Sequence, residues 1–199
     1  MTPQQEAELE FWREEFARYE LPEQYVTVRE VRDLGHYAEL LPEIRAERGR
    51  GLDLACGLVS ILGRLQCREV VAIDALLPDY ARIYSPAPNG ARYVHANGED
   101  LAAAGFADGC FDFVWCVNAA DHTPNPEKML AEARRVLKPG GRFYFFVNFD
   151  PALYAPHYEV WNLRKVEERL GAFKLLRGAQ VWSETWQKYV YSALYRRDA

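Results

Sequence analysis

The 199 residues include 49% hydrophobic and 27% charged side chains, a balance that excludes disordered, collagen-like and coiled-coil chains. The formal net charge is −5 and no basic run exceeds two residues, which disfavours nucleic acid as a partner because phosphate binding needs a basic face. The four cysteines form no C-x-x-C pair and the four histidines are scattered, so we expect no metal site.

The beginning of the chain gives no sign of export. Acidic and basic side chains stand where a signal peptide has its apolar core, and no run of 18 apolar residues occurs in the sequence. We therefore expect a soluble, cytoplasmic protein with reduced cysteines and no membrane partner.

The first fifty residues are predicted to be helical. Residues 5–20 carry apolar side chains at steps of three and four, which is typical of an amphipathic helix (Leu9, Trp12, Phe16 and Tyr19). A second, less regular helical stretch follows at about 25–45. We expect residues 1–50 to form a helical cap or lid over the carboxyl ends of the strands of a second domain, residues 51–199.

From residue 51 onward, short apolar runs alternate with helical patterns. The predicted strands are 51–55, 70–74, 93–96, 111–117 and 142–148, with a closing pair at 172–182 and 184–195. The predicted helices are 58–65, 77–83, 124–137 and 159–170. This alternation predicts an α/β fold with a doubly wound, mostly parallel seven-stranded sheet and helices on both faces. Ligands of such sheets bind at the carboxyl ends of the strands.

Acidic residues mark the first two of these strands. Asp53 lies in the first strand before the small-residue turn Ala55-Cys56-Gly57, and Asp74 ends the second strand. A turn of small residues lets a ligand approach the backbone, and an acid after the second strand can accept both hydroxyls of a ribose. Each feature taken alone is equally typical of an ordinary strand-to-helix turn or of a helix N-cap.

Five segments together occur in the order of a known family. They are Leu52–Gly57, Val70–Asp74, Ala96–Leu101, Phe111–Cys116 and Arg135–Gly141, the last of which (R-V-L-K-P-G-G) is the most specific. Over about residues 51–148 the sequence resembles the class I S-adenosylmethionine-dependent methyltransferases. The resemblance implies a Rossmann-like fold, S-adenosylmethionine as the cofactor and methyl transfer as the reaction.

The resemblance also implies which residues bind the cofactor. They are Asp53, Ala55, Cys56 and Gly57 at the methionine end, Asp74 and Ala75 at the ribose, Asn97 and Gly98 at the adenine, and Val117 and Asn118 along the methionine side. Three positions depart from the family pattern. Ala55 replaces a glycine, Asn97 replaces an aspartate, and Val59 stands where a third glycine often lies, so that it would crowd the cofactor channel.

Two histidines are candidate general bases. His122 follows the fourth strand and His157 follows the fifth, and an imidazole titrates near neutral pH. A loop hydrogen bond is the alternative role for His122. Three aromatic residues beyond the fifth strand are candidates either for the wall of an acceptor pocket or for core packing (Tyr154, Tyr158 and Trp161).

We therefore predict a methyltransferase that acts on a small organic acceptor, with the acceptor and the oligomeric state left open. Two other functions fit the same fold. A catalytically degenerate binding subunit is one, and a nicotinamide-dependent oxidoreductase is the other, although positions 55–60 read A-C-G-L-V-S and lack G-x-G-x-x-G.

Overall fold

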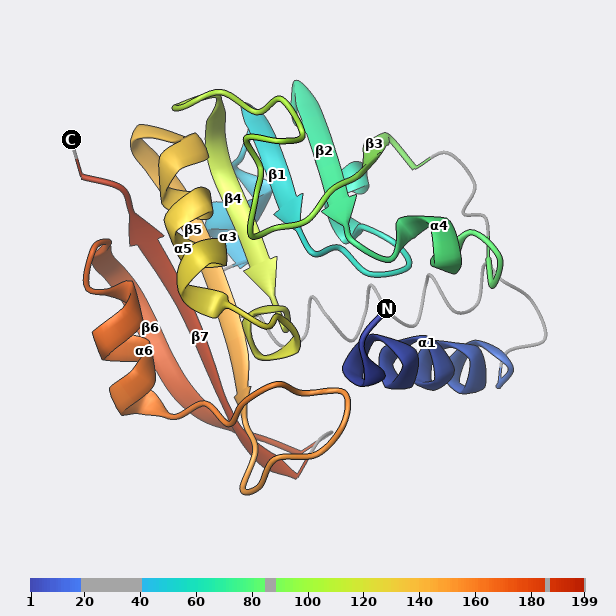
Figure 1. Cartoon of the computed structure of the whole chain (residues 1–199). Coiled ribbons are helices and arrows are strands. Elements are labelled where there is room, and N and C mark those ends of the chain that lie inside the picture. Colours follow the sequence, from blue (N-terminus) through green and yellow to red (C-terminus); the bar gives the residue numbers. More distant parts are fainter. Residues whose placement is uncertain (19–40, 85–88, 185–186, 199) are drawn as a thin grey trace.

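The computed structural model describes residues 1–18, 41–84, 89–184 and 187–198 and contains one seven-stranded sheet (Figure 1). The strand order is β3-β2-β1-β4-β5-β7-β6, in which the first five strands are parallel and β7 runs antiparallel to both of its neighbours. The predicted fold class is confirmed. The strand order reverses between β1 and β4, and this is where doubly wound sheets bind their ligands.

The strands lie close to their predicted positions. Their bounds are β1 Arg50–Leu54, β2 Glu69–Asp74, β3 Ala91–His95, β4 Phe111–Val117, β5 Leu137–Phe149, β6 Lys174–Ser183 and β7 Lys188–Arg196. β2 and β4 consist mostly of apolar side chains, and every residue of β1, β2 and β4 is buried except Arg50, Glu69, Asp112 and Val117. Such burial is typical of parallel strands covered on both faces.

Helices cover both faces of this sheet, and one further helix lies beside the strand ends. Their bounds are α1 Pro3–Phe16, α3 Leu41–Arg45, α4 Leu77–Tyr80, α5 Pro126–Val136 and α6 Leu163–Leu170, with 3-10 turns η2 Ile61–Arg64 and η3 Ala120–His122. Figure 1 shows α5 and α6 on one face of the sheet and α3 on the other. None of the helices within these described ranges is long and apolar enough to cross a membrane.

The predicted helix at 58–65 is wrong, because only the single turn η2 forms there. Gly63 packs so closely against the chain around Asn89 that a Cβ on it would lie 2.4 Å from the Asn89 carbonyl oxygen. Leu58, which lies in the turn after β1, and Val59 are both buried and pack with Leu9 and Trp12 of α1. Tertiary contacts therefore replace the helical turns that the apolar spacing predicts.

Helix α1 begins at Pro3, two residues before its predicted start, and a capping box precedes it. The Thr2 hydroxyl accepts the Gln5 backbone N–H, the Gln5 side chain accepts the Thr2 N–H, and Pro3 occupies the first turn. The helix ends at Phe16, four residues before its predicted end. Of the second predicted helix, 25–45, the structure describes only the part that contains α3, and the remainder lies outside the described residues.

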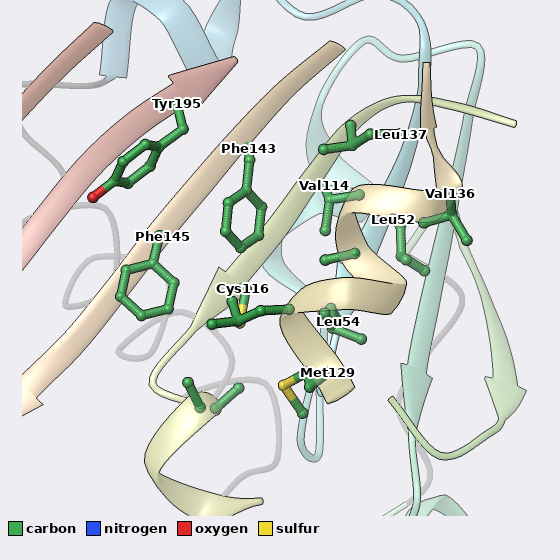
Figure 2. Close-up of a cluster of buried hydrophobic side chains, with 14 of the residues drawn as sticks. Leu52, Leu54, Val114, Cys116, Met129, Val136, Leu137, Phe143, Phe145 and Tyr195 are labelled. Atoms are coloured by element: carbon green, nitrogen blue, oxygen red, sulfur yellow. The ribbon is translucent and has the colours of Figure 1, made fainter. Parts of the chain in front are cut away.

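The largest hydrophobic core lies between the sheet and helices α5 and α6. Figure 2 shows Met129 and Val136 of α5 directed at side chains of β1, β4 and β5. Trp115 and Cys116 are buried in β4, as predicted, and Trp161 is fully buried against Phe145. This packing fixes the strand ends, and with them the loops that carry the predicted site residues.

Candidate active site

A cavity of about 480 Å³ is lined by the loops at the carboxyl ends of the strands and by helix α1. Ten of the twelve predicted site residues line it: Ala55, Gly57, Asp74, Ala75, Asn97, Gly98, Val117, Asn118, His122 and His157. The other two do not, because Asp53 is buried within β1 and Cys56 is buried with its thiol directed at the Gly57 carbonyl. Helix α1 adds further lining residues, among them Glu8, Phe11 and Trp12.

The turn after β1 is held in an unusual backbone conformation. Ala55 and Gly57 have φ angles of 60° and 63°, and the N–H of Cys56 between them donates to the Ile73 carbonyl at 2.8 Å. A left-handed conformation is unfavourable for alanine by roughly 1–2 kcal/mol, which explains why glycine is usual at the Ala55 position. The turn presents backbone rather than side chains to the cavity.

Asp74 connects this turn to the loop after β2. One of its carboxylate oxygens accepts the N–H of Gly57 at 2.9 Å and the other accepts the N–H of Leu76 at 2.8 Å. The carboxyl group is therefore fixed at the cavity wall by two backbone donors. A carboxylate held in this way can accept hydroxyl groups of a ligand in the cavity.

Asn97, Gly98 and Glu99 form the next part of the wall. The Asn97 side-chain oxygen accepts the Glu99 N–H at 2.9 Å, and the Glu99 carboxylate accepts the Thr123 hydroxyl at 2.7 Å. A Cβ at Gly98 would lie 3.0 Å from side-chain atoms of Leu54 and Met129, so a larger residue would have to displace one of them. These contacts connect the loop after β3 to the loop after β4.

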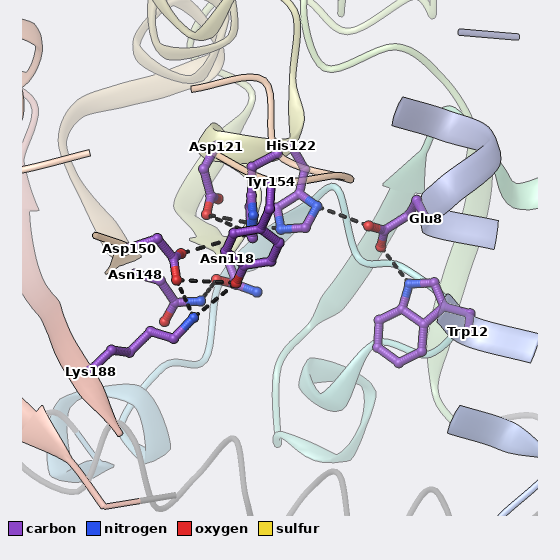
Figure 3. A network of polar contacts seen from close by, with 10 residues as sticks. Glu8, Trp12, Asn118, Asp121, His122, Asn148, Asp150, Tyr154 and Lys188 are labelled. Atoms are coloured by element: carbon purple, nitrogen blue, oxygen red, sulfur yellow. Dashed lines mark hydrogen bonds and ion pairs between the residues drawn. The ribbon is translucent and has the colours of Figure 1, made fainter. Parts of the chain in front are cut away.

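His122 is bound to helix α1. Its Nδ1 lies 2.9 Å from a carboxylate oxygen of Glu8, whose other oxygen accepts the Trp12 indole N–H at 2.5 Å (Figure 3). Burial by itself lowers the pKa of His122, but the Glu8 and Asp121 carboxylates outweigh it and raise the pKa to about 9. Burial likewise raises the pKa of Glu8, but His122 outweighs it and holds that pKa below its usual value.

His157 lies against His122, with the ring centroids 4.4 Å apart and the ring planes at 68° to each other. Burial and then the charge of His122 lower the pKa of His157, while burial raises that of Asp121, whose Oδ2 lies 3.4 Å from the His157 Nε2. The two imidazoles, which lie 35 residues apart in the sequence, therefore share one buried environment but have opposite pKa shifts.

Lys188 lies at the end of this polar network opposite helix α1 (Figure 3). Lys188 of β7 forms an ion pair with Asp150 and donates to the Tyr154 hydroxyl at 3.0 Å, and the same hydroxyl donates to Asp150 at 3.1 Å (Figure 3). Asn148 donates to the Asn118 side-chain oxygen at 2.6 Å. The cavity thus has a polar end at β5 and β7 and an aromatic wall on α1.

The structure corrects the prediction for Val59 and decides between the two roles that the sequence offers for the aromatic residues. Val59 does not line the cavity, because it packs with Leu9 and Trp12 beneath α1. Trp161 belongs to the core, and Tyr158 contacts the hydroxyl of Thr2 rather than the cavity. Of the three proposed aromatic wall residues only Tyr154 lines it.

The sequence analysis missed Glu8, Glu99 and Lys188. No local pattern distinguishes Glu8 from the other acids of its helix, and its contact with His122 joins residues 114 positions apart. Lys188 lies on the last strand, and only the antiparallel pairing of β5 with β7 brings it to the cavity.

Residues 52–145 match the family model described as a methyltransferase domain. This match covers a little under half of the chain and agrees with the family resemblance of its motifs. An arsenite methyltransferase from Aquipseudomonas alcaligenes is 32% identical over 126 residues, which cover 63% of this chain and 34% of that protein. A ubiquinone biosynthesis O-methyltransferase from Xanthomonas oryzae is 35% identical over 114 residues, covering 53% of this chain and 46% of the relative. The chain therefore spans about a third to a half of the length of these relatives.

Solved structures share the fold of the methyltransferase domain at lower sequence identity. A Burkholderia thailandensis 1,6-didemethyltoxoflavin-N1-methyltransferase, crystallised with its acceptor and S-adenosylhomocysteine, is 17% identical, with a TM-score of 0.62 over 91% of this chain and 92% of that one. The [4+2]-cyclase SpnF is 15% identical, with a TM-score of 0.63 over 82% of this chain and 80% of that one. Proteins with different activities therefore share this architecture.

Proposed function

We propose that the methyltransferase domain binds S-adenosylmethionine and transfers its methyl group to a small organic acceptor held in the same cavity. The observation that carries this proposal is the single cavity at the β1/β4 switch point, which joins the Asp74 and Asn97 positions to the two histidines. Its volume of about 480 Å³ is within the usual range for small-molecule sites. The family match supports the choice of cofactor.

The cofactor would occupy the side formed by β1, β2 and β3. Asp74 would accept the two ribose hydroxyls with its carboxylate, which the Gly57 and Leu76 N–H groups hold at the cavity wall. The methionine part would lie along Ala55, Gly57 and Asn118, and the adenine against Asn97 and Gly98. Asp53 and Cys56 would have only an indirect role as buried residues in or next to this turn, since neither lines the cavity.

The acceptor would occupy the side formed by α1 and the loops after β4 and β5. Phe11 and Trp12 offer an apolar surface there, and His122 and His157 offer polar groups. Methyl transfer is an in-line displacement in which the acceptor–carbon bond forms as the sulfur–carbon bond breaks. Holding the two reactants in line supplies roughly 7–11 kcal/mol of the barrier lowering, so a cavity that orients the acceptor supplies much of the catalysis.

We also propose that the N-terminal segment, residues 1–50, acts as a lid through its first helix. Helix α1 forms one wall of the cavity and carries the carboxylate bonded to His122. Deletion of residues 1–24 should leave a folded protein that binds S-adenosylhomocysteine more weakly and transfers no methyl group. Full activity of the shortened chain would contradict the lid, and an unfolded product would assign α1 a packing role instead.

The direct test combines a binding titration with a turnover assay. Calorimetry with S-adenosylmethionine, S-adenosylhomocysteine and NADH distinguishes a methyltransferase from an oxidoreductase. Release of S-adenosylhomocysteine in the presence of a panel of hydroxyl-, thiol- and nitrogen-containing acceptors then distinguishes an enzyme from a binding subunit. Cofactor binding with turnover of at least one acceptor is the expected result, whereas binding of NADH alone would contradict the proposal.

A further inference from the structure

Asp121 is a buried carboxylate without a hydrogen-bond donor among the residues that the structure describes. It is 2% exposed, and neither of its oxygens receives a hydrogen bond. The neighbouring His122 Nε2 is also buried without a hydrogen-bond partner in that part of the chain. Leaving buried polar groups unmatched costs about 1–3 kcal/mol each, and more for charged groups, so this cluster is built to contact something else.

The three side chains converge in the geometry of a metal site. They come from two loops, because Asp121 and His122 lie in η3 after β4 whereas His157 lies in the loop after β5. One ligand atom from each lies within 4.8 Å of the others, with Asp121 Oδ2 3.4 Å from His157 Nε2 and 3.9 Å from His122 Nε2. Ligand atoms around a tetrahedral zinc ion are about 3.4 Å apart, given bonds of roughly 2.0–2.1 Å. Small movements of these three side chains would therefore bring their ligand atoms to the distances of a tetrahedral zinc site.

Glu8 is placed where metal sites have an outer carboxylate. A His122 tautomer that donates its Nδ1–H to Glu8 directs the Nε2 lone pair away from α1 and leaves it available to a metal. Histidine ligands of metals usually donate their second N–H to a carboxylate or carbonyl in this way, which fixes the ring and raises its basicity. Trp12 in turn holds Glu8 through its indole N–H.

The charges of the cluster also fit a divalent cation. The carboxylates of Glu8 and Asp121 lie beside the two imidazoles, while the neighbouring Asp150 is already paired with Lys188. A divalent ion would neutralise Glu8 and Asp121 with both imidazoles uncharged, which is the state in which imidazole binds a metal.

We propose that Asp121, His122 and His157 bind a divalent metal ion, with Zn²⁺ as the best match, and that the open coordination position faces the cavity. Two histidines and one carboxylate are a ligand set of catalytic zinc sites, which keep one position for water or substrate. The two histidines line the cavity, so an acceptor there could reach the metal. This proposal departs from the sequence-based expectation of no metal, which rested on the scattered positions of the histidines.

Together with the proposed function, a metal ion at this site indicates the chemical class of the methyl acceptor. A metal-bound hydroxyl or thiol loses its proton to water more readily, because the cation stabilises the resulting anion. That oxygen or sulfur would then form its bond to the methyl carbon as the sulfonium carbon–sulfur bond breaks, leaving neutral S-adenosylhomocysteine. The acceptor would therefore be a hydroxyl or thiol compound, and this assignment depends on the proposed function whereas metal binding does not.

The test is a titration of the chelator-treated full chain with Zn²⁺, followed by calorimetry, and with Co²⁺, followed by visible absorption. We expect one ion per chain with each metal. Asp121→Asn and His157→Gln should abolish saturable binding, and Glu8→Gln should weaken it by about 10–100-fold, the usual effect of an outer carboxylate. His95→Gln is the matched control, because His95 is exposed and its Nε2 contacts the Ala75 carbonyl. It should bind metal like the unmodified chain.

Two outcomes would overturn the metal site. One is the absence of saturable binding in the unmodified chain, which would make the cluster an ion-paired network, and the other is equal weakening by His95→Gln. Binding of S-adenosylhomocysteine, measured on the same samples, keeps the two proposals separate. A chain that binds this cofactor product but no metal would refute only the metal site, whereas one that binds metal but no cofactor would refute the proposed function. Thermal unfolding of each variant verifies that it is folded.

Discussion

Three buried carboxylates show how the same chemical group takes different roles according to what surrounds it. Asp74 accepts two backbone N–H groups at the edge of the cavity. Glu47 accepts the Tyr144 hydroxyl at 2.7 Å and pairs with Arg142 on the opposite face of the sheet. Asp121 receives no hydrogen bond within the described part of the chain. Protein groups hold the first two in place, and Asp74 also lines the cavity, whereas the lack of such donors makes Asp121 a candidate metal ligand.

Replacing Asp74 tests the cofactor site at the level of one side chain. Asp74→Ala should weaken binding of S-adenosylmethionine by about 1.5–3 kcal/mol, the range for hydrogen bonds to a charged group. Calorimetry measures this change, with Asp108→Ala as the control because Asp108 is exposed and pairs with Arg135 away from the cavity. Unchanged affinity in a folded Asp74→Ala protein would remove Asp74 from the cofactor site.

Glu47 gives a prediction for pH dependence. Burial raises its pKa despite the Tyr144 hydroxyl and Arg142, so the folded chain holds this proton more tightly than the unfolded chain does. The stabilisation from this proton is therefore complete below the unfolded pKa of about 4.5 and is lost as the pH rises through the folded pKa.

The comparison of the unmodified chain with Glu47→Gln isolates this contribution. The unfolding free energy of the unmodified chain minus that of the variant should fall between pH 4.5 and pH 7. Urea unfolding at both values measures it, because contributions from all other groups cancel in the difference. A difference that rises with pH would mean that Glu47 is stabilised as a carboxylate.

At the scale of elements, α1 is attached to the domain by few residues. Leu9 and Trp12 are its buried side chains, and they pack on Leu58, Val59 and Tyr80, apart from the main core. The same helix forms a wall of the cavity and supplies Glu8 to His122. An element with so little buried surface belongs to the part of a fold that opens locally at low free-energy cost.

Shortening Leu9 should therefore loosen α1 before it unfolds the domain. Leu9→Ala removes buried methyl groups at a cost of roughly 2–3 kcal/mol, which should lower the hydrogen-exchange protection of α1 amides by about 30-fold or more while the strand amides keep theirs. The control is Glu10→Ala, because Glu10 is exposed and forms only an exposed pair with Arg13. Equal loss of protection in β1 and β4 would show that α1 unfolds together with the core.

At the scale of the whole molecule, the strand order decides where the cavity lies. Chain connections leave β1 and β4 in opposite directions along the sheet, so the loops after them separate and leave space between them. The antiparallel β7 then brings Lys188 to the same edge. A ligand in this space contacts loops from β1, β2, β3, β4 and β5, and so connects most of the sheet.

Such a ligand should stabilise the entire fold. At 100 times its dissociation constant, S-adenosylhomocysteine should add about 2.7 kcal/mol to the unfolding free energy, which corresponds to a rise of roughly 5–11 °C in Tm for a chain of this size. Thermal unfolding monitored by circular dichroism measures this shift. NADH at the same concentration should leave Tm unchanged, and an equal shift with NADH would favour the oxidoreductase instead.

The sequence by itself determined the sheet and most of the cofactor side of the cavity. Buried parallel strands are continuous apolar runs, and residues that directly follow such strands, such as Asp74 and Asn118, must lie at one edge of the sheet. These features are local in the chain, so spacing alone reveals them. The motif R-V-L-K-P-G-G likewise marks the end of α5, although residues 138–141, predicted as a turn before the strand, lie within β5, which begins at Leu137.

The tertiary structure decided the contacts between segments that are distant in the chain. The pairing of Glu8 with His122, the meeting of Asp121 with His157 and the position of Lys188 each depend on how a helix, a loop or an antiparallel strand docks. The same docking placed Val59 and Trp161 in the interior rather than at the cavity. Apolar periodicity shows that a face is buried but not what covers it, because the energy of burial is nondirectional.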